Sequence, residues 1–292
     1  MMLLCAKDIN LLGTTVCPGD CYKEFGSRAA RRYLEFFGSS RVPVAAGDDE
    51  GINKFPDEWR ADSKRLAELA ELNGAEGMMQ VELDSAADFI SKCLRAAAER
   101  VSIIITGPPT HLGEVLSMEP SFRDKIERVW VMGGAVRVRG NVKAAGHDGS
   151  AEWNFFNHPK AADLLIRSGV SMTLVSLDAT NKAPVTRDFL ERLAAQAQTS
   201  RVSKLALATW KVALRHIEHA DYTQRYYFWD TLTAAAMLEP SLLKTESMRI
   251  KVVTDGPSQG RTVEDRAGSV VDVGVDVNSA RLESLILDLF KR

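Results

Sequence analysis

The sequence lacks the features that typify membrane proteins, secreted scaffolds and nucleic-acid-binding proteins. No apolar run in its 292 residues approaches the roughly 20 residues that cross a bilayer. Its 37 Lys and Arg residues are balanced by 39 Asp and Glu residues, and no basic cluster is available to hold phosphates. The segment Met1–Ala6 is too short for a signal peptide and lacks a basic start, so we expect a cytoplasmic protein. What remains is an ordinary globular composition, without membrane or nucleic acid as a partner.

Cysteine is also scarce. Three of the four cysteines lie within the first 21 residues, and four are too few for a disulfide framework in a chain of this length. Cys17 and Cys21 flank a turn, but no second Cys/His pair follows at zinc spacing. We therefore expect reduced thiols at all four positions: Cys5, Cys17, Cys21 and Cys93.

Short β-branched runs alternate with longer amphipathic stretches, which predicts an α/β fold with an open, mostly parallel sheet and helices on both faces. The predicted strands are 11–16, 42–45, 101–106, 129–132, 172–177 and 248–254. The predicted helices are 27–37, 61–72, 86–100, 111–118, 159–168, 186–197, 204–218, 231–238 and 279–291. No linker, repeat or low-complexity tract divides the chain, so a single domain over 1–292 is expected.

The richest candidate segment begins where the strand 129–132 ends. Gly133 and Gly134 follow it, and a polar loop then leads to Asn141, Glu152 and Asn154. Paired glycines let the backbone approach a ligand, and these amides and this carboxylate offer the mixed donors and acceptors that sugar hydroxyls need. A glycine turn with a solvated tip explains the same pattern equally well.

Three other positions have both a structural and a functional interpretation. Thr106 ends a strand, so its carbonyl could face a hard cation, although Pro108 and Pro109 simply suit a helix start. Asp230 either caps the helix that follows or takes part in a site. The aromatic run that ends at Trp229, and Trp59 on a separate loop, could stack on a flat ligand or fill a core.

Five separated motifs, in this order, resemble the nucleoside hydrolase family and, within it, the purine-preferring inosine-adenosine-guanosine branch. They are Thr106-Gly107-Pro108, Val131-Met132-Gly133-Gly134-Ala135, Arg139-Gly140-Asn141-Val142, Ala151-Glu152-Trp153-Asn154 and Trp229-Asp230-Thr231-Leu232-Thr233-Ala234-Ala235. The resemblance extends from about Met2 to the C-terminus and implies a Rossmann-like sheet. It also implies hydrolysis of the N-glycosidic bond of purine ribonucleosides to ribose and free base, with a calcium ion and a homo-oligomeric assembly, dimer or tetramer.

The resemblance also implies roles for single residues. Asp230 and the Thr106 carbonyl would bind calcium, and Asn141 and Asp230 would be catalytic. The ribose would contact Asn141, Glu152, Asn154 and Met132. The purine would lie between Trp59 and Trp229, with Asp20 at its edge, and indole rings favour a protonated base as a cation–π partner.

No general acid stands out for the leaving base. Glu218, His219 and Arg225 precede Trp229 and are candidates. His216 and His219 could share a helix face, but no third zinc ligand lies near them, and helix-end histidines that favour the dipole explain them more simply.

The sequence departs from the family at its beginning. The family starts with a strand and an Asp-x-Asp-x-x-x-Asp-Asp loop that supplies most calcium ligands and the water-activating base, whereas Met2–Ala6 aligns with the helix after that loop. We therefore expect an N-terminally truncated hydrolase domain that lacks the first strand and has an incomplete calcium site. Its neighbouring strands would expose unpaired backbone, which favours aggregation or association.

The alternative is a catalytically inactive homologue that binds nucleoside or ribose without cleaving it. A nucleotide-dependent oxidoreductase is a poorer explanation, because no Gly-x-Gly-x-x-Gly follows any predicted strand.

Overall fold

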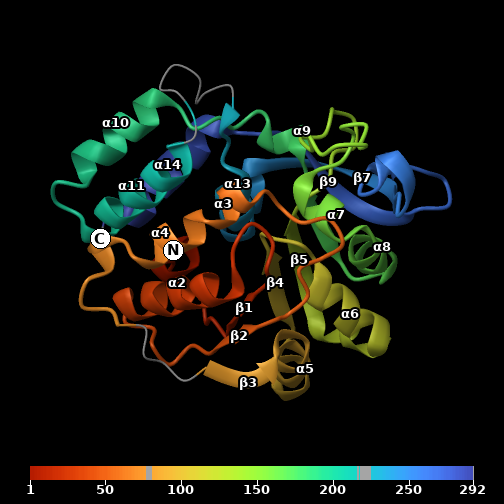
Figure 1. Cartoon of the computed structure of the whole chain (residues 1–292), viewed down its shortest axis with the longest axis horizontal. Coiled ribbons are helices and arrows are strands. Elements are labelled where there is room, and N and C mark those ends of the chain that lie inside the picture. Colours follow the sequence, from red (N-terminus) through yellow and green to blue (C-terminus); the bar gives the residue numbers. More distant parts are fainter. Residues whose placement is uncertain (77–80, 216, 218–224, 292) are drawn as a thin grey trace.

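The computed structural model describes residues 1–76, 81–215, 217 and 225–291 and contains two sheets. The first is parallel, with the order β1 (Thr14–Val16), β2 (Val44–Ala46), β3 (Val81–Ser85). The second has the order β4-β5-β6-β9-β7-β8, and Figure 1 shows it extending from β4 and β5 near the centre of the view to β9 and β7 at the right. Its strands are β4 (Val101–Ile105), β5 (Ile126–Met132), β6 (Met172–Val175), β7 (Leu243–Val252), β8 (Thr262–Glu264) and β9 (Ser269–Val277).

Every predicted strand and helix has a counterpart in this structure, apart from shifts at the ends. The longer helices are α2 (Lys23–Phe36), α4 (Asp62–Ala67), α5 (Ala86–Ala96), α6 (Thr110–Met118), α8 (Pro159–Arg167), α10 (Arg187–Gln196), α11 (Arg201–Leu214), α13 (Trp229–Leu238) and α14 (Ser279–Phe290). Short helices that the periodicity does not predict are α3 (Asp57–Arg60), α7 (Trp153–Asn157) and α9 (Leu177–Thr180), whereas α1 (Met2–Cys5) is the helix expected from the resemblance. None of the described helices is long and apolar enough to cross a membrane.

Alternate residues of the central strands face two separate hydrophobic clusters. Val129 and Val131 of β5 pack with α5, α6 and α8, whereas Trp130 packs with α1, α10, α11, α13 and α14. Both faces are therefore covered by helices, as the mainly apolar composition of β5 and β6 requires. These findings confirm the predicted fold class.

The second sheet ends in an antiparallel part of which the sequence analysis predicted β7 but missed β8 and β9. β7 pairs antiparallel with both β8 and β9, and β9 returns to pair parallel with β6. Asp272, Gly274 and Asp276 interrupt the apolar pattern of β9, so its sequence does not have the composition of a buried strand. The strand β3 was also missed, and its Glu82 and Asp84 weaken the signal in the same way.

The two sheets do not share a hydrogen-bonded pair of strands in the described part of the chain. β1 pairs with β2, and β4 pairs with β5, and each of the two is an edge strand. No disulfide links any of the four cysteines, all of which lie in described segments.

Candidate functional site

The site forms around the carboxyl end of β5, where the two glycines have a packing role. Gly134 has φ of +76°, a conformation that favours glycine. A Cβ on Gly133 would lie 2.5 Å from Phe155, and one on Gly134 would lie 3.0 Å from Thr262. The space on the Cβ side of these glycines is therefore filled by the protein's own side chains.

Glu152 is the buried carboxylate that organises this end of the sheet. Its Oε1 accepts from the Asn154 N–H at 2.9 Å, and its Oε2 accepts from the N–H groups of Gly134 and Phe155, both at 3.2 Å. Glu152 is only 2% exposed, and this burial raises its pKa to about 7 although the backbone donors act in the opposite direction. Glu152 thus caps α7 and fixes the turn after β5 at the same time.

Two amides complete the polar wall beside Glu152. Asn154 donates from Nδ2 to the Met132 carbonyl at 3.1 Å, and the same nitrogen lies 3.4 Å from the Met132 sulfur. Asn141 accepts the Trp153 N–H through its Oδ1 at 3.1 Å and is only partly buried. The structure therefore brings together Met132, Asn141, Glu152 and Asn154, the four residues that the resemblance groups around one site.

Asp20 and Asp230 are two further acidic residues of the site, and Asp230 interacts electrostatically with Asp20 and Glu152. Both side chains are exposed to solvent, yet the surrounding protein raises the pKa of each carboxyl, chiefly through desolvation. Asp230 is raised further by repulsion from Asp20 and Glu152. The N-cap of α13 is Phe228, and Asp230 lies in the first helical turn without a capping hydrogen bond. The capping interpretation of Asp230 is therefore wrong, and its accessible carboxyl is available for other contacts.

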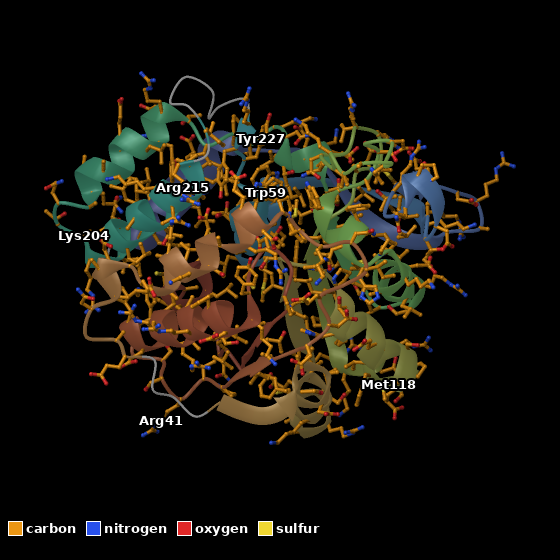
Figure 2. The ribbon with its side chains drawn as sticks, viewed as in Figure 1. Arg41, Trp59, Met118, Lys204, Arg215 and Tyr227 are labelled. Atoms are coloured by element: carbon orange, nitrogen blue, oxygen red, sulfur yellow. The ribbon has the colours of Figure 1, made fainter. Side chains whose placement is uncertain are left out.

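The two predicted aromatic residues lie in different surroundings. Trp229 packs with Met132 beside the polar wall, and its ring lies 4.9 Å from that of Tyr226. Trp59 is 40% exposed on α3 and contacts Trp153 edge to face at 5.3 Å. Figure 2 shows Trp59 near the centre of the molecule, whereas Met118 lies at its margin. Because Trp153 adjoins Glu152 and Asn154 in sequence, both tryptophans connect to the same wall.

Thr106 directly follows β4 and is exposed. Ile105 pairs with Val131, so the parallel register places Thr106 beside Met132. Its carbonyl and the Asp230 carboxylate are hard oxygen donors, which calcium prefers. Within the described segments, however, no three His, Cys, Asp or Glu side chains are grouped as metal ligands. Calcium takes about six to eight oxygens, so these residues alone do not fit a tightly bound ion.

Several residues that shape the site were missed from the sequence. Asp178, just after β6, accepts the N–H groups of Val136 and Arg137 at 2.9 and 2.8 Å and so fixes the loop that leads to Asn141. Its position after a strand was the available signal. Tyr226 was singled out only as part of the aromatic run that ends at Trp229; burial raises the pKa of its hydroxyl, and Asp230, Asp20 and Asp62 raise it further.

The histidines and the candidate groups for the leaving base lie partly inside and partly outside the segments that the structure describes. His158 contacts Thr110 at 3.2 Å and Asp49 at 3.5 Å, an arrangement that no sequence spacing suggested. Of the candidate acids for the leaving base, Arg225 is described and exposed. Glu218 and His219, together with the suggested zinc ligand His216, lie outside the described residues.

The fold and the site define an α/β protein whose amides, carboxylates and indoles are suited to bind a sugar joined to a flat base. The chain belongs to the nucleoside hydrolase family: the model for inosine-uridine preferring nucleoside hydrolase matches residues 1–284. Family members hydrolyse the N-glycosidic bond of nucleosides. The match confirms the family recognised from the five motifs.

Known relatives agree with this assignment. The solved inosine-uridine preferring nucleoside hydrolase from Bacillus anthracis is similar over 99% of this chain and 93% of its own, with 33% identity and a TM-score of 0.92. The purine-preferring ribonucleoside hydrolase from Gardnerella vaginalis has 25% identity and a TM-score of 0.82, and the similarity covers 99% of this chain and 92% of that one.

Curated relatives carry pyrimidine names. The pyrimidine-specific ribonucleoside hydrolase RihA of Escherichia coli is 27% identical over 91% of this chain and 83% of its own length. Uridine nucleosidase 1 of Arabidopsis thaliana is 26% identical over 91% of this chain and 77% of its own length. The relatives thus include both base classes, and their names do not decide which base this chain prefers.

Proposed function

We propose that this nucleoside hydrolase cleaves purine ribonucleosides to ribose and free purine. The proposal depends on one observation: the polar wall lies beside Trp229 and Asp230 around the carboxyl end of β5. The wall consists of Asn141, Glu152 and Asn154. One surface offers mixed hydrogen-bonding groups and the adjoining surface offers an aromatic face. A nucleoside has these same two parts.

In the proposed reaction, the bond between C1′ of the ribose and the base nitrogen breaks, and its electron pair leaves with the base. The oxygen of a water molecule bonds to C1′ on the other side. One proton of this water passes to an acceptor and finally to the base, and the other stays on the new C1′ hydroxyl of ribose. The sugar passes through an oxocarbenium-like state, so groups that hold it must favour developing positive charge.

The proposed ribose contacts are Asn141, Asn154 and Glu152, with Met132 packed beside the ring. Because burial raises the pKa of Glu152 to about 7, this residue can both accept from and donate to a hydroxyl near neutral pH. Asp230 is proposed to accept from the attacking water. Its carboxyl is accessible, is repelled by the charge of Glu152, and has no competing role as a helix cap.

The purine preference rests on the aromatic residues. Trp229 beside Met132 and the half-exposed Trp59 offer two indole faces, and Asp20 offers a carboxyl for the edge of the base. A purine presents a larger π surface than a pyrimidine, and a protonated purine gains from indole contact as it leaves. Arg225 is the described candidate for assisting the leaving base.

Calcium assistance is part of the proposal in a restricted form. Asp230 and the Thr106 carbonyl are the protein oxygens we assign to the ion, and when bound it would supply positive charge that orients hydroxyls and water. Since this set is small, we expect weak binding, and every step above is assigned to the chain's own residues.

A dimer or tetramer is likewise proposed and is measured by sedimentation velocity.

A second candidate function is binding without cleavage. It is favoured by the lack, within the described segments, of a grouped set of carboxylates that could hold a metal and activate water together. Calorimetry with inosine, run beside a ribose-release assay on inosine and uridine, separates the two functions. Ribose release supports the hydrolase, inosine over uridine supports the purine preference, and saturable binding without ribose supports the binder.

A further inference from the structure

The short helix α7 contacts a different part of the site at each of its ends. At its start, Glu152 and Asn154 belong to the polar wall. At its end, the fully buried Asn157 contacts the loop between β2 and α3, which lies far away in the sequence. Figure 1 shows the orange segment that leads into α3 passing beside α7. α7 therefore joins the polar wall to the segment that carries Trp59.

Asn157 binds this loop with both its side chain and its backbone. Its Nδ2 donates to the carbonyl oxygens of Glu50 and Asn53, at 3.0 and 2.9 Å. Its own carbonyl oxygen accepts from the N–H groups of Ile52 and Asn53, at 2.9 and 3.0 Å. Asn53 in turn donates from its Nδ2 to the Phe156 carbonyl at 2.7 Å. Five hydrogen bonds thus fix the loop on the end of α7.

The side chain of Asn157 serves the loop as a donor. Its Nδ2 is used twice, whereas its buried Oδ1 accepts no hydrogen bond from the described residues. The loop also fits closely here, because Gly51 has φ of +73° and a Cβ on it would lie 2.3 Å from this Oδ1. The position of the loop is therefore set by contact with Asn157 as well as by hydrogen bonds.

Glu50 carries this restraint to α3. Asn157 holds its backbone carbonyl, and its carboxylate accepts from the Arg60 guanidinium at 2.9 Å. Arg60 is only 4% exposed, and its guanidinium carbon lies 4.5 Å from the centre of the Tyr22 ring. Because Arg60 directly follows Trp59 in α3, the backbone that carries Trp59 depends on these contacts.

Two aromatic residues complete the connection between the loop and α7. The rings of Phe55 and Trp153 lie 5.2 Å apart, and they lie 6.4 and 5.3 Å from the ring of Trp59. Trp153 is buried, whereas Trp59 is 40% exposed and so has fewer contacts that fix its ring. The orientation of Trp59 therefore depends on how firmly the loop is held on α7.

We infer that Asn157 is a positioning residue for recognition of the base. It holds the loop on α7, so the Trp59 ring stays against Trp153 before a nucleoside binds. This inference rests on the proposed contact between Trp59 and the purine. Preorganised groups increase affinity because fewer of them must be ordered on binding. Loss of the Asn157 side chain therefore weakens purine binding, while the ribose contacts that assist bond breaking remain.

Kinetics of Asn157→Ala in the whole chain test this inference. We expect KM for inosine to rise about fivefold while kcat changes by less than about twofold, and KM for uridine to rise less, since a pyrimidine offers a smaller π surface. Asn278→Ala is the matched control, because Asn278 also bonds a backbone group with its side chain but lies at the start of α14. Its kinetics are expected to equal those of wild type.

The Trp59→Leu background shows whether Asn157 acts through this ring. In that background, Asn157→Ala is expected to leave KM for inosine unchanged, because the group that it positions is absent. A second readout needs no substrate: acrylamide quenching of the Trp59 fluorescence, obtained as the difference between proteins with and without Trp59. We expect a larger quenching constant in Asn157→Ala than in wild type.

A milder variant covers the case in which Asn157→Ala does not fold. Asn53→Ala removes one of the five hydrogen bonds and is expected to change KM and quenching in the same direction, to a smaller degree. It then takes the place of Asn157→Ala in every comparison.

Three results would overturn the inference. Additive effects of Asn157→Ala and Trp59→Leu on KM would mean that Asn157 does not act through Trp59. A fall in kcat as large as the rise in KM would place the effect in the polar wall. Unchanged quenching of Trp59 would mean that the loop keeps its position without the Asn157 side chain.

Failure of the proposed function has a different result. If wild type releases no ribose, hydrolysis is refuted, and the Kd for inosine from calorimetry replaces KM with the same expected changes. The quenching measurement is independent of turnover, so increased quenching in Asn157→Ala supports the positioning role even then. Ribose release with unchanged KM and unchanged quenching refutes the positioning role alone.

Discussion

The buried carboxyl of Glu152 makes stability depend on pH in a direction opposite to that of most surface carboxylates. Its pKa is raised from 4.5 to about 7, first of all because burial disfavours the charged form. The folded protein therefore binds this proton more tightly than the unfolded chain does. The stabilisation that results is complete below the unfolded pKa of 4.5 and is lost as the pH rises through about 7.

The magnitude follows from the same two values. A carboxyl whose pKa moves from 4.5 to about 7 on folding changes the free energy of unfolding by about 3 kcal/mol across that interval. Replacing Glu152 by glutamine removes the titration. It also leaves fewer acceptors for three backbone N–H groups, which costs about 1–3 kcal/mol at low pH.

Urea unfolding from pH 4.5 to 8 measures this effect. We expect wild type to be more stable than Glu152→Gln near pH 5, and the difference to shrink by about 3 kcal/mol by pH 8. Glu127→Gln is the matched control, because Glu127 is exposed at the edge of β5 and its curve is expected to run parallel to wild type. A difference between wild type and Glu152→Gln that stays constant with pH would refute the reasoning.

The remaining predictions concern the base, the ion and the turn after β5. Trp229→Leu is expected to raise KM for inosine at least tenfold, and more than for uridine, while Phe37→Leu leaves both unchanged; equal effects on both substrates would argue against a purine stack. Calcium titration followed by thermal shift is expected to show weak binding, with a Kd of about 10⁻³ M. The shift is expected to disappear in Asp230→Asn and to persist in Asp163→Asn. A shift that survives Asp230→Asn would mean that Asp230 does not bind the ion. Gly134→Ala is expected to lower the free energy of unfolding more than Gly169→Ala does. Both glycines have positive φ, which costs an alanine about 1–2 kcal/mol at either position. Only at Gly134 would the new methyl group also contact Thr262. Equal costs at the two glycines would mean that the Thr262 contact relaxes freely.

The sequence predicted the parallel core well because its strands are buried on both faces. Val129 to Met132 are apolar without interruption, and Met172 to Val175 are interrupted only by the buried Thr173, so both segments have the composition of a buried strand. β9 escaped because its aspartates and Gly274 are tolerated only through pairing with β6 and β7, which lie far away in the sequence. Its strand conformation depends on tertiary contacts that local composition does not encode.

The site was predicted through its motifs more than through its periodicity. Met132, Asn141, Glu152 and Asn154 meet because one carboxylate accepts backbone donors from both the turn after β5 and the start of α7. Spacing could not reveal that Gly133 makes room for Phe155, since this contact depends on how α7 folds back. The assignment of these residues to contacts with ribose, purine and calcium remains a proposal, and so does the expectation that the chain forms a single domain.

The most direct test of the proposed function is ribose release by the 292-residue chain. Purified protein is incubated with inosine and with uridine, and wild type is compared with Asn141→Ala and with the distant control Asp163→Asn. We expect ribose from both nucleosides, faster from inosine, with Asn141→Ala strongly impaired and Asp163→Asn unchanged. Saturable inosine binding without any ribose would contradict hydrolysis and identify a binding protein.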